Sequence, residues 1–248
     1  MKEQIYTIPL NMAIEANDEC PICNLRRKMN NDIMDSVLGA AACMEPNFRE
    51  ITDKEGFCED HYHKMLKYGN SLGNAWMLKT YFMRTKEQFD DATKGFKPKK
   101  KGLFEKKKES ENPIVKWNSS RKATCHICKR ESESYEGIIR TFLYMWSKDS
   151  AFREKIKASK GFCVSHYGDL CDAADRELNE KDLTDFYDIT IPLMKENIDR
   201  VFEDVSWFID KYEIQNKDAD WKNSKDALQR GMQKMKGGYP ADDFYRQK

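Results

Sequence analysis

Hydrophobic residues recur along most of the chain with the three- and four-residue spacing of amphipathic helices. One series consists of Leu25, Met29, Ile33, Val37, Leu38 and Ala41. A second series consists of Tyr135, Ile138, Ile139, Phe142, Leu143 and Trp146. Because residues three and four apart share one face of an α-helix, each series predicts a helix with one buried side. The chain has only 12 glycines, 7 prolines and five valines, which favours an all-α fold over an extensive sheet.

Two long helices are expected, one directly after His61 and one farther along the chain after His166. The first continues from His61 to about Phe89. The second begins near Thr190, a residue type that caps helix N-termini, and Pro192 suits its first turn. Its apolar stripe consists of Met194, Ile198, Val201, Phe202, Val205, Phe208 and Tyr212. A last helix is expected over residues 224–236, before a Gly-Gly pair.

Composition narrows the classes of function. In 248 residues, 43 Lys and Arg balance 42 Asp and Glu, so the net charge is +1 and bulk charge predicts no nucleic-acid or membrane binding. Hydrophobic residues make up 40%, which excludes wholesale disorder. No apolar run has the length of a membrane span, and the N-terminus lacks the apolar core of a secretory signal. We therefore expect a cytoplasmic protein.

Two short motifs occur twice, separated by the same 105 residues. Cys-x-x-Cys begins at positions 20 and 125, and Cys-x-x-His begins at positions 58 and 163. Each Cys-x-x-His follows Gly-Phe and precedes Tyr. A Phe-Arg-Glu sequence lies between the motifs at 48–50 and again at 152–154. This register predicts an internal duplication with pseudo-twofold repeats.

The duplication predicts the organisation of the chain. Residues 1–92 are expected to form a first metal-binding helical repeat and residues 121–215 a second. Residues 93–120 are expected to be a basic linker, and residues 216–248 a C-terminal helix and tail.

The motifs have the residue types of a metal site. A Cys-x-x-Cys turn directs two thiolates at one centre, and Cys-x-x-His places both side chains on one face of a helix. Gly56 and Gly161, two residues before the Cys, suit a tight turn into that helix. The helix N-terminus favours the thiolate that binds metal. We expect one Cys3His set in each repeat. The first set is Cys20, Cys23, Cys58 and His61, and the second is Cys125, Cys128, Cys163 and His166.

Four thiolate and imidazole ligands favour tetrahedral zinc, two ions per chain, and an iron–sulfur cluster is the alternative. The order of the motifs is treble-clef-like, with helices where a treble clef has a β-hairpin. The other two cysteines, Cys43 and Cys171, have no counterpart at the repeat offset and are expected in the core. His63 and His126 also lack counterparts and are expected to be solvated or capping histidines, with a fifth ligand or a proton shuttle as the alternative.

The segment Lys94–Lys108 holds eight lysines, one acidic residue and two phenylalanines. Its position between the repeats favours a solvated linker. The alternative is nucleic-acid binding through phosphate contacts and stacking, which we consider the minor hypothesis.

No catalytic signature accompanies the metal motifs. The chain has no phosphate-binding loop, nucleophile elbow or H-E-x-x-H sequence. A catalytic zinc usually keeps one coordination position open, whereas each set here has four protein ligands. The sequence leaves the enzyme question open and favours a metal-binding scaffold that binds a protein partner. The alternative is an iron–sulfur or metal-thiolate redox enzyme.

The opening residues 2–10, the Cys-Pro-Ile-Cys turn, the repeated Gly-Phe-Cys-x-x-His-Tyr and residues 223–227 carry a resemblance. The whole chain resembles an uncharacterised family of anaerobic Firmicutes, a domain of unknown function. The resemblance implies a cytoplasmic bacterial protein and implies no activity.

Overall fold

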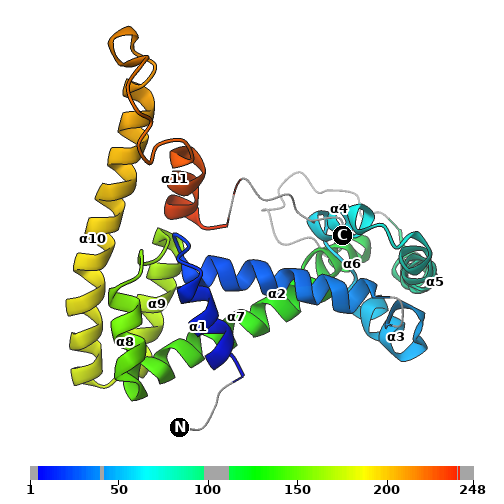
Figure 1. The fold of residues 1–248 in the computed structure, drawn as a ribbon. Helices are drawn as coiled ribbons and strands as arrows, with labels where there is room; N and C mark the ends of the chain where they lie inside the picture. The colour runs from blue at the N-terminus through cyan, green and yellow to red at the C-terminus, as the bar shows by residue number, and fades with distance from the viewer. Residues whose placement is uncertain (1–4, 40–41, 98–111, 239, 241–248) are drawn as a thin grey trace, which may run out of the picture. The chain divides into compact units, whose positions relative to one another are not determined.

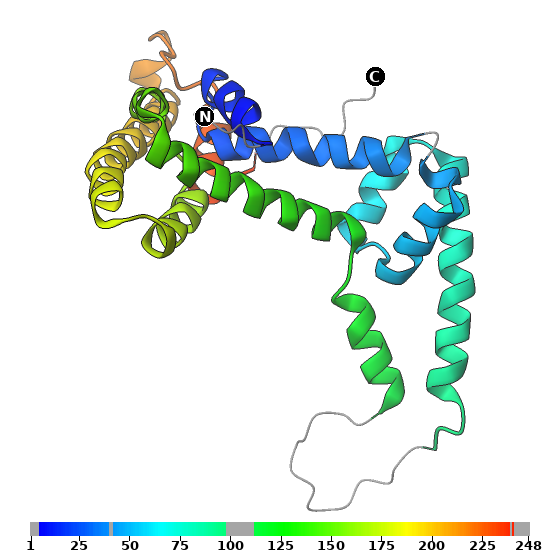
Figure 2. The ribbon, with the colours of Figure 1, turned by 90° about the horizontal axis from the view of Figure 1, so that it is seen from below.

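The computed structural model of the chain describes residues 5–39, 42–97, 112–238 and 240. Within these ranges there are eleven α-helices, two short 3-10 helices and no strand, which confirms the all-α prediction (Figures 1 and 2). The elements are α1 (Thr7–Glu15), α2 (Pro21–Leu38), η1 (Ala42–Met44), α3 (Pro46–Glu55), α4 (Glu59–Tyr68), α5 (Ser71–Thr93), α6 (Pro113–Lys122), α7 (His126–Lys148), α8 (Ser150–Lys157), α9 (Val164–Glu177), α10 (Glu180–Asp210), η2 (Ile214–Asn216) and α11 (Ala227–Lys236). Across the described ranges, every helix is too short or too polar to cross a lipid bilayer.

The helices repeat in one order. A long helix follows each Cys-x-x-Cys motif, a short helix carries Phe-Arg-Glu, a third helix begins at Cys-x-x-His, and a fourth long helix follows. This order describes α2 to α5 and, again, α7 to α10. Sequence register and helix order therefore agree with a duplicated unit.

The chain forms two compact units, and each draws on both sequence repeats. One unit combines the described residues of Met1–Asn30 with those of Glu133–Asp243. The other comprises the described residues of Asn31–Ser132. Each has its own hydrophobic core, one around Phe142 and Trp146 and the other around Met34. The divisions fall inside α2 and α7, so the compact units differ from the repeats expected at 1–92 and 121–215.

The prediction of one helix from His61 to about Phe89 is wrong. Helix α4 ends at Tyr68 because Gly69 takes a left-handed conformation with φ of 93°. The side chain of Asn70 then accepts a hydrogen bond from the Gly73 amide and begins α5.

The predicted helix start at Thr190 is also wrong. Helix α10 begins after Asn179, whose side chain accepts a hydrogen bond from the amide of Asp182. The Thr190 hydroxyl is used inside the helix, where it donates to the Phe186 carbonyl at 2.7 Å. Pro192 lies within α10 and removes one amide donor from it.

Candidate metal centres

The eight predicted ligands gather in two Cys3His groups. Site I consists of Cys20, Cys23, Cys163 and His166, and site II consists of Cys58, His61, Cys125 and Cys128. Within each site, one ligand atom from every residue lies within 4.8 Å of the others. The prediction of one set per repeat is therefore wrong, because each site joins the Cys-x-x-Cys of one repeat to the Cys-x-x-His of the other.

Helix length explains this exchange. Helix α2 begins next to Cys20 and has 18 residues, which corresponds to about 27 Å. Helix α7 begins next to Cys125 and has 23 residues, or about 35 Å. A long helix thus follows each Cys-x-x-Cys motif and leads the chain away from that motif before the next Cys-x-x-His occurs in the sequence. The ligands that complete the site come from the other copy.

Every ligand pair lies at a helix N-terminus. Cys163 and Cys58 are the N-cap residues of α9 and α4, and the histidine follows three residues later. Cys20 and Cys125 immediately precede α2 and α7. The sequence predicted this placement for Cys-x-x-His and a non-helical turn for Cys-x-x-Cys, but both have the i, i+3 spacing of a helical turn. Each site therefore receives the positive ends of two helix dipoles, which stabilise thiolates.

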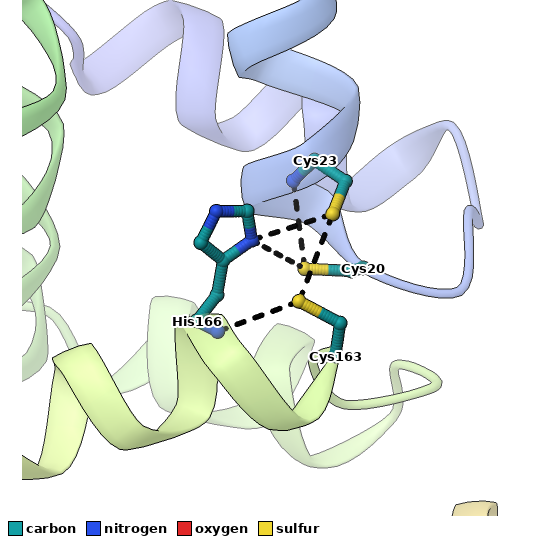
Figure 3. A group of neighbouring side chains, drawn as sticks. All are labelled: Cys20, Cys23, Cys163 and His166. Carbon is teal, nitrogen blue, oxygen red and sulfur yellow. Dashed lines mark hydrogen bonds between the residues drawn. The ribbon is translucent and has the colours of Figure 1, made fainter. Parts of the chain in front are cut away.

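Site I is enclosed by protein. All four ligands are buried, and Figure 3 shows them pointing toward one another from α2 and α9. The Sγ atoms of Cys23 and Cys163 are 3.8 Å apart. Nδ1 of His166 lies 3.4 Å from the sulfur of Cys20 and 3.3 Å from that of Cys23.

Site II has the same internal geometry and a more open surface. The sulfurs of Cys58, at the start of α4, and Cys128, in α7, are 3.7 Å apart. Nδ1 of His61 lies 3.1 Å from the Cys58 sulfur and 3.4 Å from the sulfurs of both Cys125 and Cys128. His61 and Cys125 are buried, Cys58 is half-buried and Cys128 is exposed.

These distances fit a single metal ion. A tetrahedral ion with metal–sulfur bonds of about 2.3 Å separates its sulfurs by about 3.8 Å. An iron–sulfur cluster places several irons and sulfides between its protein ligands, and so requires wider spacing. The donor set and its spacing in sites I and II thus suit one tetrahedral ion each.

Comparison with known families gives one result. The model of a family of unknown function, DUF6062, matches residues 1–242. The chain belongs to the DUF6062 family. Both sites and α11 fall inside the matched region of this DUF6062 chain. No curated protein matches the chain, and no solved structure matches it.

Protons are shared unevenly among the thiols. Hydrogen bonds from Cys20 and Cys23 hold the pKa of Cys163 far below its usual range. Cys163 in turn raises the pKa of Cys23 to about 12 through the hydrogen bond between the two side chains. Burial and the nearby thiols raise the pKa of Cys20 as well. One thiolate in site I is therefore favoured, and a second or third is disfavoured by like charge.

Site II shows the same uneven sharing. Burial alone would raise the pKa of Cys125, but hydrogen bonds, chiefly from His61, lower it to about 6. Burial would lower the pKa of His61, yet Cys125, Glu131 and Cys58 raise it to about 10. Burial and the neighbouring Cys125 raise the pKa of Cys128 above its usual value. Metal binding at either site therefore displaces protons.

Two residues beside the histidines were not predicted. Arg26 Nη1 lies 3.1 Å from Nε2 of His166, and its guanidinium packs over the Tyr135 ring. Glu131 Oε1 lies 3.5 Å from Nε2 of His61. Positions 26 and 131 are related by the same 105-residue offset as the ligands, which is the signal that could have found them. The DUF6062 sites thus face opposite charges at equivalent positions.

The glycines before the Cys-x-x-His motifs behave as predicted. Gly56 and Gly161 have φ of 62° and 69°, a conformation that residues with a Cβ rarely adopt. A Cβ at Gly161 would lie 3.1 Å from the Met194 sulfur, and one at Gly56 would clash with the Tyr81 hydroxyl at 2.5 Å.

Helix α11 covers site I. Its Lys234 is fully buried and donates to the carbonyls of Glu19 and Lys160, each at 2.8 Å. Lys234 Nζ also lies 3.1 Å from the Glu19 carboxylate. These contacts hold the segment just before Cys20 and the turn just before Gly161. The C-terminal helix, predicted to lie outside both repeats, is therefore part of the unit that builds site I.

The remaining candidates lie outside the two sites. Cys43 is buried in one core and Cys171 packs beside the other, which confirms their expected placement. His63 is exposed, whereas His126 is buried with its Nδ1 2.6 Å from Glu55 Oε2. Most of the lysine-rich segment falls at 98–111, outside the described residues.

Proposed function

We propose that the protein is a zinc-stabilised helical scaffold in which sites I and II each hold one structural zinc ion. The observation that carries this proposal is the spacing of the ligand atoms. The sulfur–sulfur distances of 3.8 and 3.7 Å equal the edge of a zinc–thiolate tetrahedron within about 0.1 Å.

In this scaffold a zinc ion links two helix N-termini that are far apart in the sequence. Each site has four protein ligands, which fill a tetrahedral ion without a position for water. Structural zinc contributes folding free energy of about 10–16 kcal/mol in small zinc-binding peptides. Cross-linking of helices, rather than catalysis, is the chemistry that such closed sites supply.

We propose a protein as the partner of this scaffold and the cytoplasm as its compartment. The end of α10 supports a protein partner, because Phe202, Tyr212 and Ile214 are exposed large apolar side chains. The cysteines support a reducing compartment, because all eight are free thiols and six lie in metal-ligand geometry.

The test is metal analysis together with a visible absorption spectrum. The protein would be purified without oxygen from cells supplied with both iron and zinc. Two zinc ions per chain and no visible absorption are expected. Iron with a broad visible band would overturn the zinc assignment and favour the redox alternative. Chelator should then unfold the zinc-loaded chain, as followed by circular dichroism, and an unchanged spectrum would contradict a structural role.

A further inference from the structure

Cys23 and Cys128 are equivalent residues with different access to solvent. They are related by the 105-residue offset, and each is the second Cys of its motif. Each sulfur lies next to that of the Cys in the Cys-x-x-His motif, at 3.8 Å for Cys23 and 3.7 Å for Cys128. Cys23 is buried, with 4% of its surface exposed, whereas Cys128 is exposed to solvent. Because of the duplication, the buried Cys23 can serve as the control for the reactivity of the exposed Cys128.

The end of α11 accounts for the burial of Cys23. A Cβ placed on Gly237 would lie 3.4 Å from the Cys23 sulfur and 3.2 Å from the Cys163 sulfur. The Gly238 backbone also lowers the pKa of Cys23, in opposition to the effect of Cys163. The end of α11 therefore lies close against that sulfur and leaves Cys23 buried. Among the described residues, no comparable segment buries Cys128.

The charges beside the two sites also differ. Three thiolates and one divalent ion carry a formal charge of −1. Glu131 adds negative charge beside His61 of site II, whereas Arg26 adds positive charge beside His166 of site I. Two cations follow Cys128 in the sequence, and each contacts another residue: Lys129 pairs with Glu55, and Arg130 donates to Ser36. A more negative surrounding makes a metal-bound thiolate a stronger nucleophile.

We propose that Cys128 is a modification site, at which the metal-loaded chain reacts with soft alkylating electrophiles. The Cys128 Sγ lone pair attacks the electrophilic carbon and forms a sulfur–carbon bond. The bond from that carbon to its leaving group breaks, and the leaving group departs with the electron pair. No proton moves, because the metal-bound sulfur is already a thiolate. The product is a neutral thioether, which holds a divalent ion more weakly than a thiolate does.

This inference rests on the proposed metal-loaded sites, and its test begins with a metal count. The holoprotein is treated with limiting iodoacetamide, and each cysteine is followed by peptide mass mapping. A metal-sensitive dye measures the ion released. Cys128 should react at least about tenfold faster than Cys23, because thiolate reactivity follows exposure and local charge. One metal ion should be released for each Cys128 that is alkylated.

Matched variants separate reactivity from folding. Glu131→Gln should slow alkylation of Cys128 severalfold while two ions remain bound. Arg26→Gln changes the equivalent position of site I and should leave the Cys128 rate unaltered. Cys128→Ser removes the reacting sulfur and is expected to lose the site II ion, and Cys23 should remain unreactive in this variant.

The outcomes are distinguishable. A chain that binds no metal overturns both the proposed function and this inference. A chain with two bound ions in which Cys23 or Cys58 reacts as fast as Cys128 overturns the inference alone. Alkylation of Cys128 without release of metal also contradicts it.

Discussion

At the scale of single residues, Gly161 sets the entry of the chain into site I. Its φ of 69° is a conformation that costs an ordinary residue about 1–2 kcal/mol. Gly161→Ala should therefore lower the free energy of unfolding of the metal-loaded protein by at least that amount, since the new Cβ also crowds Met194. Denaturant unfolding measures the change.

Gly168→Ala is the matched control for this substitution. Gly168 is an exposed residue inside α9, and among the described residues no atom outside its chain neighbours and the local helix backbone lies within 4 Å of the position that an added methyl group would take. The same change there should stabilise the protein by about 0.5–1 kcal/mol, because glycine is a poor helix former. Equal effects at the two positions would show that backbone conformation at Gly161 is not the cause.

Metal affinity should depend steeply on pH. The pKa values of Cys20 and Cys23 in site I are raised, as are those of Cys128 and His61 in site II. At neutral pH these groups hold protons that a metal must displace, so affinity rises as pH rises. With two protons displaced per site, the association constant should increase about a hundredfold per pH unit. Competition titrations with a chelating dye between about pH 6 and 8 measure this slope. A constant affinity would show that the thiols are already deprotonated.

At the scale of elements, α11 is tied to site I by one buried lysine. Lys234→Met removes the ammonium that donates to the carbonyls of Glu19 and Lys160, whereas the Glu19 carboxylate keeps its ion pairs with Arg200 and Arg230. Leaving a buried carbonyl without its donor costs about 1–3 kcal/mol. Unfolding experiments should show a loss of this order, and amide exchange in α11 should become faster. Lys236→Met, at an exposed position of the same helix, should change neither.

Sequence patterns predicted the helices better than their boundaries. The apolar series of residues 135–146 became one face of α7, with Ile138, Phe142 and Trp146 fully buried. The break at Gly69 was missed because the apolar spacing continues across it. The start of α10 was missed because Thr190 and Pro192 have the chemistry of a helix start, although Asn179 provides the actual cap. Local chemistry offered two starts, and packing of Phe186 in the core favoured the earlier one.

The eight residues that gather in sites I and II were predictable from sequence, and their grouping was not. Residue type and the repeated spacing identified all eight, since both are local properties. Which Cys-x-x-His completes which Cys-x-x-Cys depends on where long helices lead the chain. Two equivalent copies allow either combination, so the motif Cys20-x-x-Cys23 carries no information on whether Cys58 or Cys163 joins it. The length of the helix that follows each Cys-x-x-Cys is the physical property that determines which Cys-x-x-His completes the site.

At the scale of the whole molecule, the exchanged ligands predict which parts of the chain lose order together. Cys20→Ser and Cys163→Ser should each remove one metal ion and weaken amide protection in the same unit, residues 5–30 and 133–238. Cys58→Ser should instead weaken residues 31–132. Hydrogen exchange read by mass spectrometry measures the patterns.

A cysteine outside the sites tests the specificity of this result. Cys43 is buried in the core of the second unit and belongs to neither site, so Cys43→Ser should retain both ions. If Cys20→Ser and Cys58→Ser weakened one common region, while Cys163→Ser weakened another, the sites would be built within repeats after all.

The exchange of ligands also imposes an order on synthesis. In the sequence, the ligands of site II, from Cys58 to Cys128, are nested inside those of site I, from Cys20 to His166. During translation at about 5–20 residues per second, the inner site can close while α9 has yet to be made. Cys20 and Cys23 remain without their two partners, Cys163 and His166, until more than a hundred further residues have been synthesised. Site I is therefore completed after site II, although its first two cysteines are the first of the eight to be synthesised.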